Sequence, residues 1–116
     1  MKKIFLIVFL AAPQIVAQAQ TPAAANADNG KKLFLKQNCY YCHGTAGQGS
    51  RDGARIAQTA LNLQGLMRYV RKPLGAMPAY TEKILTDQEL TDIFAYLKSL
   101  PPAKAPKDIK ILDDIK

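Results

Sequence analysis

The sequence contains no tryptophan, one histidine and two cysteines among its 116 residues. Two cysteines are too few for a disulfide framework, and with a single His they cannot supply the four ligands of a structural zinc site. No apolar run reaches the roughly 20 residues that a transmembrane helix needs. The composition fits one small globular domain, which is marginally stable at this size. Such a domain needs a further source of stability.

Residues 1–19 have the three regions of a secretory signal peptide. Lys2 and Lys3 precede an unbroken apolar run over residues 4–12, and Ala17-Gln18-Ala19 forms a small-residue cleavage site. The sequence therefore predicts export, a periplasmic location and a mature chain that starts with a lead-in over residues 20–28. The chain is basic, with 16 Lys and Arg against 9 Asp and Glu. Since export is predicted and no nucleic-acid-binding motif is present, the charge favours an acidic protein partner over nucleic acid.

The run Cys39-Tyr40-Tyr41-Cys42-His43 uses both cysteines and the only histidine. Two thiols separated by two residues, with a His directly after them, are typical of covalent haem c attachment. The thiols add to two vinyl groups of the haem, and His43 then lies beneath the iron as its proximal ligand. The motif predicts one haem c, bound through Cys39 and Cys42.

Three other interpretations of this motif explain less of the sequence. A redox dithiol of the thioredoxin kind would follow a strand in an alternating strand and helix pattern, and no such pattern surrounds the motif. A zinc site lacks its fourth ligand, and a plain disulfide would leave His43 without a role.

Helical periodicity and capping signals predict three main helices and no strands. The first helix has Asp28 or Asn29 as its predicted N-cap and ends near the Cys motif. The second starts after Asn62 and ends at Lys72-Pro73, and the third starts after Thr86 and ends at Pro101-Pro102. The third start is the clearest, because Thr86-Asp87-Gln88-Glu89 is a capping box. We expect an all-α cytochrome domain over residues 29–100, and a Pro- and Lys-rich tail over residues 101–116 that carries four apolar residues near its end.

The stretch from Asn29 to Leu100 resembles the class I cytochromes c. Gly30 and Phe34 before the haem motif, Met77-Pro78 in a loop, and the run from Ile93 to Leu97 match landmarks of that family. The resemblance implies that the first and last helices cross beside the haem, with Gly30 and Phe34 facing Tyr96. It also implies a small bacterial monohaem protein that serves periplasmic dehydrogenases.

The second axial ligand has two candidates, Met67 and Met77, once Met1 leaves with the signal peptide. Met67 lies on the apolar side of a predicted helix and is expected to fill the core. Met77 lies in a loop between Gly75 and Pro78, where the family places its thioether ligand. We therefore expect His43 and Met77 to ligate the iron. The haem propionates have only weak candidates: Arg55, Arg68, Arg71 and Tyr80.

His and Met ligation leaves no open position for a substrate, so the predicted function is one-electron transfer between Fe(III) and Fe(II). A periplasmic dehydrogenase would be the donor, and a terminal oxidase, a reductase or another cytochrome the acceptor. Some of the basic residues 51, 55, 68, 71 and 72 should surround the exposed haem edge. One alternative is a cytochrome subunit held tightly by a periplasmic dehydrogenase. Another, a gas sensor or peroxidase-like enzyme, would need the iron position that Met77 should close.

Overall fold

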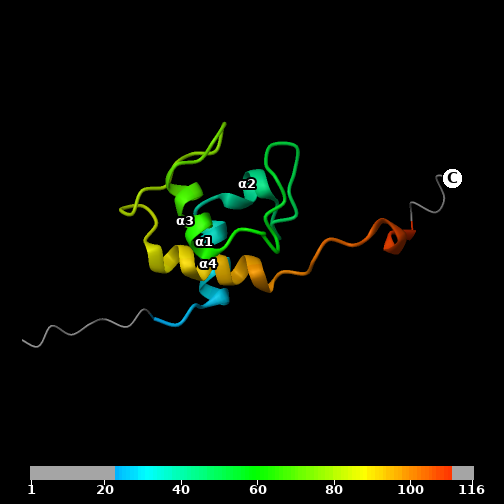
Figure 1. Ribbon diagram of the computed structural model, residues 1–116, viewed down its shortest axis with the longest axis horizontal. Coiled ribbons are helices and arrows are strands. Elements are labelled where there is room, and N and C mark those ends of the chain that lie inside the picture. The colour runs from blue at the N-terminus through cyan, green and yellow to red at the C-terminus, as the bar shows by residue number, and fades with distance from the viewer. Residues whose placement is uncertain (1–22, 111–116) are drawn as a thin grey trace, which may run out of the picture.

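The computed structural model describes residues 23–110. Within this range the chain forms α1 (Ala27–Lys36), α2 (Cys39–His43), α3 (Leu63–Arg71), α4 (Asp87–Ser99) and the short 3-10 helix η1 (Pro106–Asp108) (Figure 1). The described residues contain no strand, and the fold is the expected all-α arrangement of a small class I cytochrome c. The predicted signal peptide and the apolar end of the tail, residues 111–116, lie outside the described residues.

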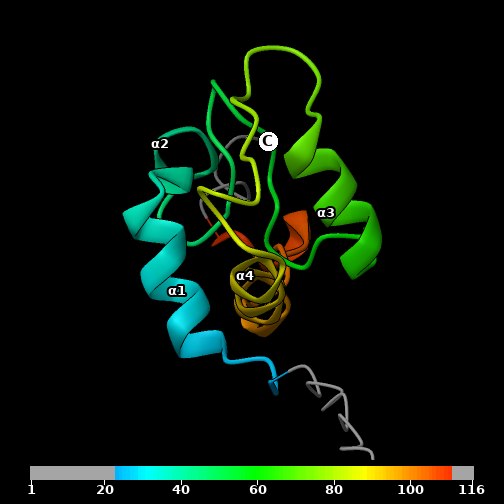
Figure 2. The same cartoon turned by 90° about the vertical axis from the view of Figure 1, so that its left-hand side faces the viewer.

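Helices α1 and α4 cross and make the most extensive contact between helices in the described part of the chain. Figure 2 looks along α4, with α1 on one side of it and α3 on the other. A Cβ atom at Gly30 would collide with the backbone carbonyl of Asp92, so only glycine lets the two helices approach this closely. The rings of Phe34 and Tyr96 lie 5.5 Å apart at the same crossing. The predicted crossing of the first and last helices is therefore confirmed.

The start of α1 differs from the prediction. Its N-cap is Asn26, whose side-chain oxygen accepts a hydrogen bond from the backbone N–H of Asn29 at 3.0 Å. The predicted caps, Asp28 and Asn29, lie inside the first turn of the helix, so the prediction was wrong by at least two residues. Asn26 can cap because its backbone is extended (φ −119°, ψ 103°), which turns the side chain back over the first free N–H groups.

The first helix ends near the cysteine motif, as predicted, and does not include it. Helix α1 ends at Lys36, and Asn38 has a left-handed backbone (φ 58°) that breaks the helical path. Cys39 and Cys42 therefore lie on a separate short helix, α2. Because of this break, α2 can take a different direction from α1, and the two helices remain in contact.

Helices α3 and α4 begin and end as predicted. Asn62 caps α3 by accepting from the backbone N–H of Gly65 at 2.8 Å, and α3 ends at Arg71, just before Lys72-Pro73. Thr86 and Glu89 form both hydrogen bonds of a capping box at the start of α4. The flanking Leu85 and Leu90 are each 1% exposed and belong to the core.

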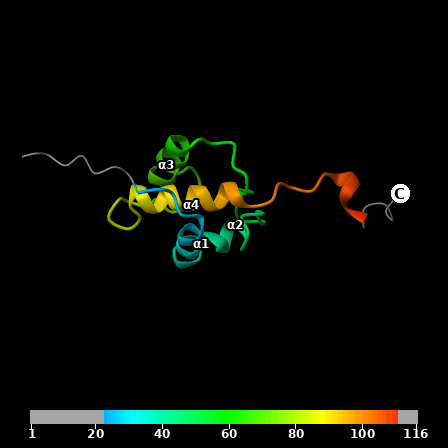
Figure 3. The same cartoon turned by 90° about the horizontal axis from the view of Figure 1, so that it is seen from below.

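The long loop between α2 and α3 returns to the end of α4. The backbone N–H of Gln58 donates to the carbonyl of Leu97 at 2.9 Å, and Lys98 Nζ donates to the carbonyl of Thr59 at 3.0 Å. Figure 3 shows α3 and α1 on opposite sides of α4, with the described part of the tail running away from the helices. None of the helices in residues 23–110 is long and apolar enough to cross a membrane.

Candidate functional site

A cavity of about 830 Å³ lies between α2, α3, α4 and the loops that join them. Its size suits a cofactor, since ligand cavities commonly measure roughly 300–1,000 Å³. Most of its wall is apolar and includes core residues of α1, α3 and α4 and of the segment just before α4: Phe34, Leu66, Val70, Leu85, Leu90, Ile93 and Leu97. The four residues predicted to bind haem, Cys39, Cys42, His43 and Met77, all line this one cavity.

Helix α2 presents both cysteines and the histidine to the cavity. Cys39 and Cys42 are three residues apart in a helix, so their side chains share a face. The following loop folds back on the end of α2: Ser50 Oγ donates to the carbonyl of Cys42 at 2.6 Å, and the backbone N–H of Gly49 donates to the carbonyl of His43 at 2.8 Å. The short helix is thus held by its own downstream loop.

The His43 ring is oriented by a backbone carbonyl. Its Nδ1 lies 2.7 Å from the carbonyl oxygen of Ala54. A carbonyl can only accept, so Nδ1 carries a proton, and in the neutral ring the lone pair is then on Nε2. This arrangement is typical of metal-bound histidines, in which the second ring nitrogen donates to a carbonyl or carboxylate. His43 is therefore in the tautomer that an axial iron ligand requires.

The two cysteines are free and half-buried. Burial raises the pKa of the Cys39 thiol to about 11, against a smaller opposing effect of a backbone hydrogen bond. Redox-active dithiols have the opposite property, a thiol pKa lowered toward or below neutrality. The burial of Cys39, which raises the pKa of its thiol, thus disfavours the thioredoxin-like interpretation of the motif.

Met77 reaches the cavity from the loop between α3 and α4, whereas Met67 does not line the cavity. Met67 lies on α3 and packs, partly buried, against the core. The backbone of Gly75 is left-handed (φ 70°), which supports a turn two residues before Met77. The structure therefore separates the two methionines: Met77 lines the cavity, and Met67 packs against the core.

Tyr80 closes the Met77 loop against α1 and α3. Its hydroxyl donates to the carbonyl of Gln37 at 2.9 Å, and its backbone N–H donates to the carbonyl of Val70 at 3.1 Å. Burial, followed by the nearby Cys39 and Cys42, raises the pKa of the Tyr80 phenol. Tyr80 is thus a neutral hydrogen-bond donor at the cavity wall.

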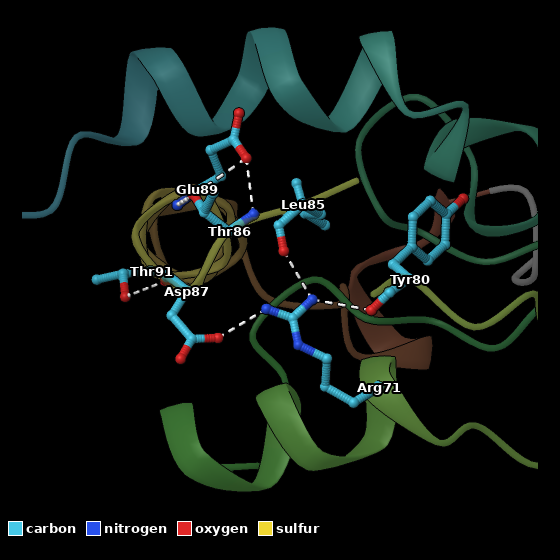
Figure 4. A network of polar contacts seen from close by, with 7 residues as sticks. All are labelled: Arg71, Tyr80, Leu85, Thr86, Asp87, Glu89 and Thr91. Carbon is cyan, nitrogen blue, oxygen red and sulfur yellow. Dashed lines mark hydrogen bonds and ion pairs between the residues drawn. The ribbon is translucent and has the colours of Figure 1, made fainter. Parts of the chain in front are cut away.

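The candidates for the haem propionates lie in different places. Arg55 and Tyr80 line the cavity, and Arg55 also donates through Nη2 to the carbonyl of Pro101 at 2.9 Å. Arg68 is exposed and does not line the cavity. Arg71 is already bound by protein groups, as Figure 4 shows. Tyr80 already donates its single hydroxyl hydrogen to the carbonyl of Gln37, so the structure favours Arg55, which has further N–H donors, over the other three.

Sequence reasoning missed two contributors to the site. The carbonyl of Ala54 carries no side-chain signal, so only the folded loop reveals its contact with His43. Arg71 was considered only as a propionate ligand, although its position at the end of α3, next to a loop with a ligand residue, could have suggested a capping role.

Comparisons with known proteins agree with this geometry. The model of the family described as cytochrome c oxidase, cbb3-type, subunit III matches residues 25–97. The chain is 35% identical over 102 residues to a thiosulfate dehydrogenase of Psychrobacter arcticus, covering 72% of this chain and 29% of that protein. It is 28% identical over 80 residues to cytochrome c-555 of Methylococcus capsulatus, covering 67% of this chain and 65% of that protein.

A third relative is the cbb3-type cytochrome c oxidase subunit CcoP of Helicobacter pylori, 28% identical over 82 residues, which are 65% of this chain and 28% of that protein. The chain thus spans less than a third of the thiosulfate dehydrogenase and of CcoP. No solved structure matches it significantly. Because the family model covers most of the chain, and the covered part contains the haem motif, Met77 and the crossing of α1 with α4, the chain belongs to this family of small monohaem c-type cytochrome domains.

Proposed function

We propose that this chain is an exported monohaem cytochrome c that carries single electrons between periplasmic redox partners. The observation that carries the proposal is the convergence of Cys39, Cys42, His43 and Met77 on one largely apolar cavity. Membership of a c-type cytochrome family implies covalently bound haem c. The donor set fits that group, because two thiols share a helix face and the His43 ring is in the correct tautomer.

In this proposal each of the four residues has a separate role. Cys39 and Cys42 each add an S–H bond across one vinyl group, so that two thioethers form and no atom is lost. His43 offers its Nε2 lone pair as the proximal ligand, and Met77 offers its thioether from the opposing loop. Bound haem c then supplies the one-electron Fe(III)/Fe(II) couple.

The cavity wall influences which oxidation state is favoured. Apolar side chains such as Phe34, Leu90 and Leu97 exclude water and oppose the more highly charged ferric state, which raises the reduction potential. If His43 and Met77 both bind the haem iron, no coordination site would remain for a substrate. We therefore assign electron transfer and no bond-making chemistry to this domain.

The location and partners are inferred from the N-terminal sequence and from the relatives. The signal-like residues 1–19 indicate export to the periplasm. Relatives named as a thiosulfate dehydrogenase and as an oxidase subunit support a dehydrogenase as electron donor and an oxidase, a reductase or another cytochrome as acceptor. A terminal oxidase partner agrees with the family that the chain matches.

Haem extraction tests the proposal directly. Acid acetone should leave the haem with the protein, because two thioethers hold it, and the reduced pyridine haemochrome should show the band of a haem with both vinyls saturated. Cys39→Ala should shift that band toward the one-thioether form. Release of free haem from the unaltered protein into the acetone would refute covalent attachment.

A second candidate function is that of a cytochrome subunit held by a dehydrogenase. It is favoured by the partial matches, since this chain corresponds to less than a third of two larger redox proteins. It also agrees with a tail that leaves the domain (Figure 1). Deleting residues 103–116, which spares the Arg55 contact at Pro101, should abolish co-purification with an enzyme if the chain is such a subunit.

A further inference from the structure

The loop that carries Met77 is closed at a neck between the end of α3 and Tyr80. The backbone N–H of Tyr80 donates to the carbonyl of Val70 at 3.1 Å, and Arg71 Nη1 donates to the carbonyl of Tyr80 at 2.8 Å. Met77 lies three residues before this neck. Leu74 and Gly75, toward the loop tip, are exposed. The position of Met77 therefore depends on how firmly the neck is held.

Arg71 joins this neck to the start of α4. In addition to Tyr80, Nη1 donates to the carbonyl of Leu85 at 2.7 Å, and Nη2 contacts Asp87 Oδ1 at 2.7 Å (Figure 4). The Arg71 side chain is 23% exposed, and Leu85 is a fully buried residue of the cavity wall. One guanidinium group thus binds the backbone carbonyls of Tyr80 and Leu85 and the carboxylate of Asp87.

We propose that Arg71 is the positioning residue that keeps Met77 on the iron, by clamping the neck of its loop to α4. The inference rests on the proposed function, in which Met77 is the second axial ligand. Without the Arg71 contacts, less free energy is needed to move the loop away from the iron, so an external ligand displaces Met77 more readily. Arg71 itself does not line the cavity, and it acts only through Tyr80 and Leu85.

The planar guanidinium suits this role better than an ammonium group. Its fork presents several N–H donors in fixed directions, so it can hold the carbonyls of Tyr80 and Leu85 together with Asp87. Lysine offers a compact charge on a flexible stem and cannot reproduce that fixed pattern. The same engagement explains why Arg71 is unsuited to binding a haem propionate.

The test is a titration of the ferric holoprotein with imidazole, followed by loss of the Met-to-iron charge-transfer band. Arg71→Met should bind imidazole about ten-fold more tightly, which corresponds to about 1.4 kcal/mol, or one lost hydrogen bond at the neck. Arg71→Lys should show a smaller increase in affinity. This milder variant keeps the test decisive if Arg71→Met yields too little holoprotein.

Two matched variants separate positioning from general stability. Arg68→Met removes an exposed arginine from the same helix and should leave the imidazole affinity within about two-fold of the wild type. Asp87→Asn breaks the ion pair but keeps both carbonyl contacts, and should also have an effect within about two-fold. Thermal unfolding is measured for every variant, so that loss of stability and loss of ligation are recorded independently.

The outcomes are distinguishable. A normal charge-transfer band in the wild type, with imidazole affinity unchanged in Arg71→Met and Arg71→Lys, would overturn this inference alone. An effect of Asp87→Asn as large as that of Arg71→Met would also overturn it, because the ion pair and not the loop neck would then be responsible. A wild-type spectrum without the band would overturn the Met77 ligand assignment and this inference with it.

Discussion

The chemistry of His43 depends on one backbone atom. Because the carbonyl of Ala54 accepts from Nδ1, the orientation of the ring is fixed and Nε2 is the nitrogen left for a metal ion. The contact belongs to the loop that follows α2, which is also tied to that helix through Ser50. A substitution that shifts this loop would therefore disturb the proximal ligand without touching it.

The two methionines give a prediction at the scale of single residues. Met77→Ala should remove the weak Met-to-iron charge-transfer band, lower the reduction potential and allow the reduced protein to bind carbon monoxide. The reason is that the thioether stabilises the ferrous state and fills the sixth position. Visible spectroscopy of the oxidised protein and redox titration measure both effects.

Met67→Leu is the control for that prediction. Met67 packs against the core away from the cavity wall, so the change should keep the band and cost less than about 1.5 kcal/mol of unfolding free energy. If Met67→Leu removes the band while Met77→Ala preserves it, the ligand assignment is wrong. Carbon monoxide binding by the unaltered reduced protein would instead support a sensor or peroxidase-like function.

At the scale of helices, buried Asp92 joins α4 to the start of α1. Asp92 is 5% exposed, and its Oδ1 accepts from the backbone N–H of Asn26 at 2.9 Å and from Gln88 Nε2 at 3.2 Å, while its Oδ2 accepts from Asn29 Nδ2 at 2.7 Å. Burial acts to raise the pKa of Asp92, but these hydrogen bonds outweigh it and lower the pKa below the ordinary 3.8. The charged carboxylate therefore stabilises the crossing of α1 and α4.

This carboxylate gives the stability of the fold a defined pH dependence. Since the folded pKa of Asp92 is the lower one, its contribution is fully present above the ordinary value of 3.8 and is lost as the pH falls through the folded value. Asp92→Asn should reduce the unfolding free energy at neutral pH by about 1–3 kcal/mol and weaken the decline of stability in acid. Denaturant unfolding of the holoprotein between neutral and acidic pH measures both.

Glu82→Gln is the matched control, because it removes an exposed carboxylate outside this network. It should change stability by less than about 0.5 kcal/mol at every pH. If Asp92→Asn were as stable as the wild type at neutral pH, or lost stability in acid as steeply, the carboxylate would not have the role described here.

At the scale of the whole molecule, the segment that follows the haem motif is basic, and one of its arginines lines the cavity. The stretch from residue 44 to residue 77 holds five basic residues and one acidic residue. Arg51 is almost fully exposed and makes a surface ion pair with Asp52 at 3.5 Å, and Arg55 lines the cavity. Of the five basic residues expected around the haem edge, Arg71 is excluded, because its guanidinium is bound inside the fold.

This distribution predicts salt-dependent electron transfer. The second-order rate of oxidation by hexacyanoferrate(III), an anionic probe, should fall as salt is raised, because exposed charges are screened over about 8 Å at physiological ionic strength. The double change Arg51→Glu with Arg55→Glu should lower the rate at low salt, and high salt should erase most of the difference. Stopped-flow absorbance measures these rates.

The control makes the same change of charge on helix α1, away from the loop that carries Arg51 and Arg55. Lys31→Glu with Lys32→Glu alters two exposed residues of α1 that do not line the cavity, and it should slow the reaction less. Equal slowing by both pairs would show that net charge matters and that the placement of Arg51 and Arg55 does not.

Local sequence signals were sufficient to predict most of the elements and to suggest the chemistry proposed for the motif. Asn62 and the Thr86–Glu89 capping box act on neighbouring N–H groups, so their effect is readable from spacing alone. The Cys39-Tyr40-Tyr41-Cys42-His43 motif is also local, because all of its groups lie within five consecutive residues. The resemblance to the class I cytochromes c supplied the candidate Met77 and the helix crossing.

Contacts between distant residues were decided only by the tertiary structure. Asn26 caps α1 in company with Asp92, which is 66 residues away, and the Ala54 carbonyl reaches His43 from a following loop. Arg71 was open to several roles in the sequence, and its place at a loop neck became visible only with the carbonyls of Tyr80 and Leu85 beside it. The physical reason is that backbone acceptors and long-range partners leave no periodic pattern, so the sequence determines which groups exist and packing determines which of them meet.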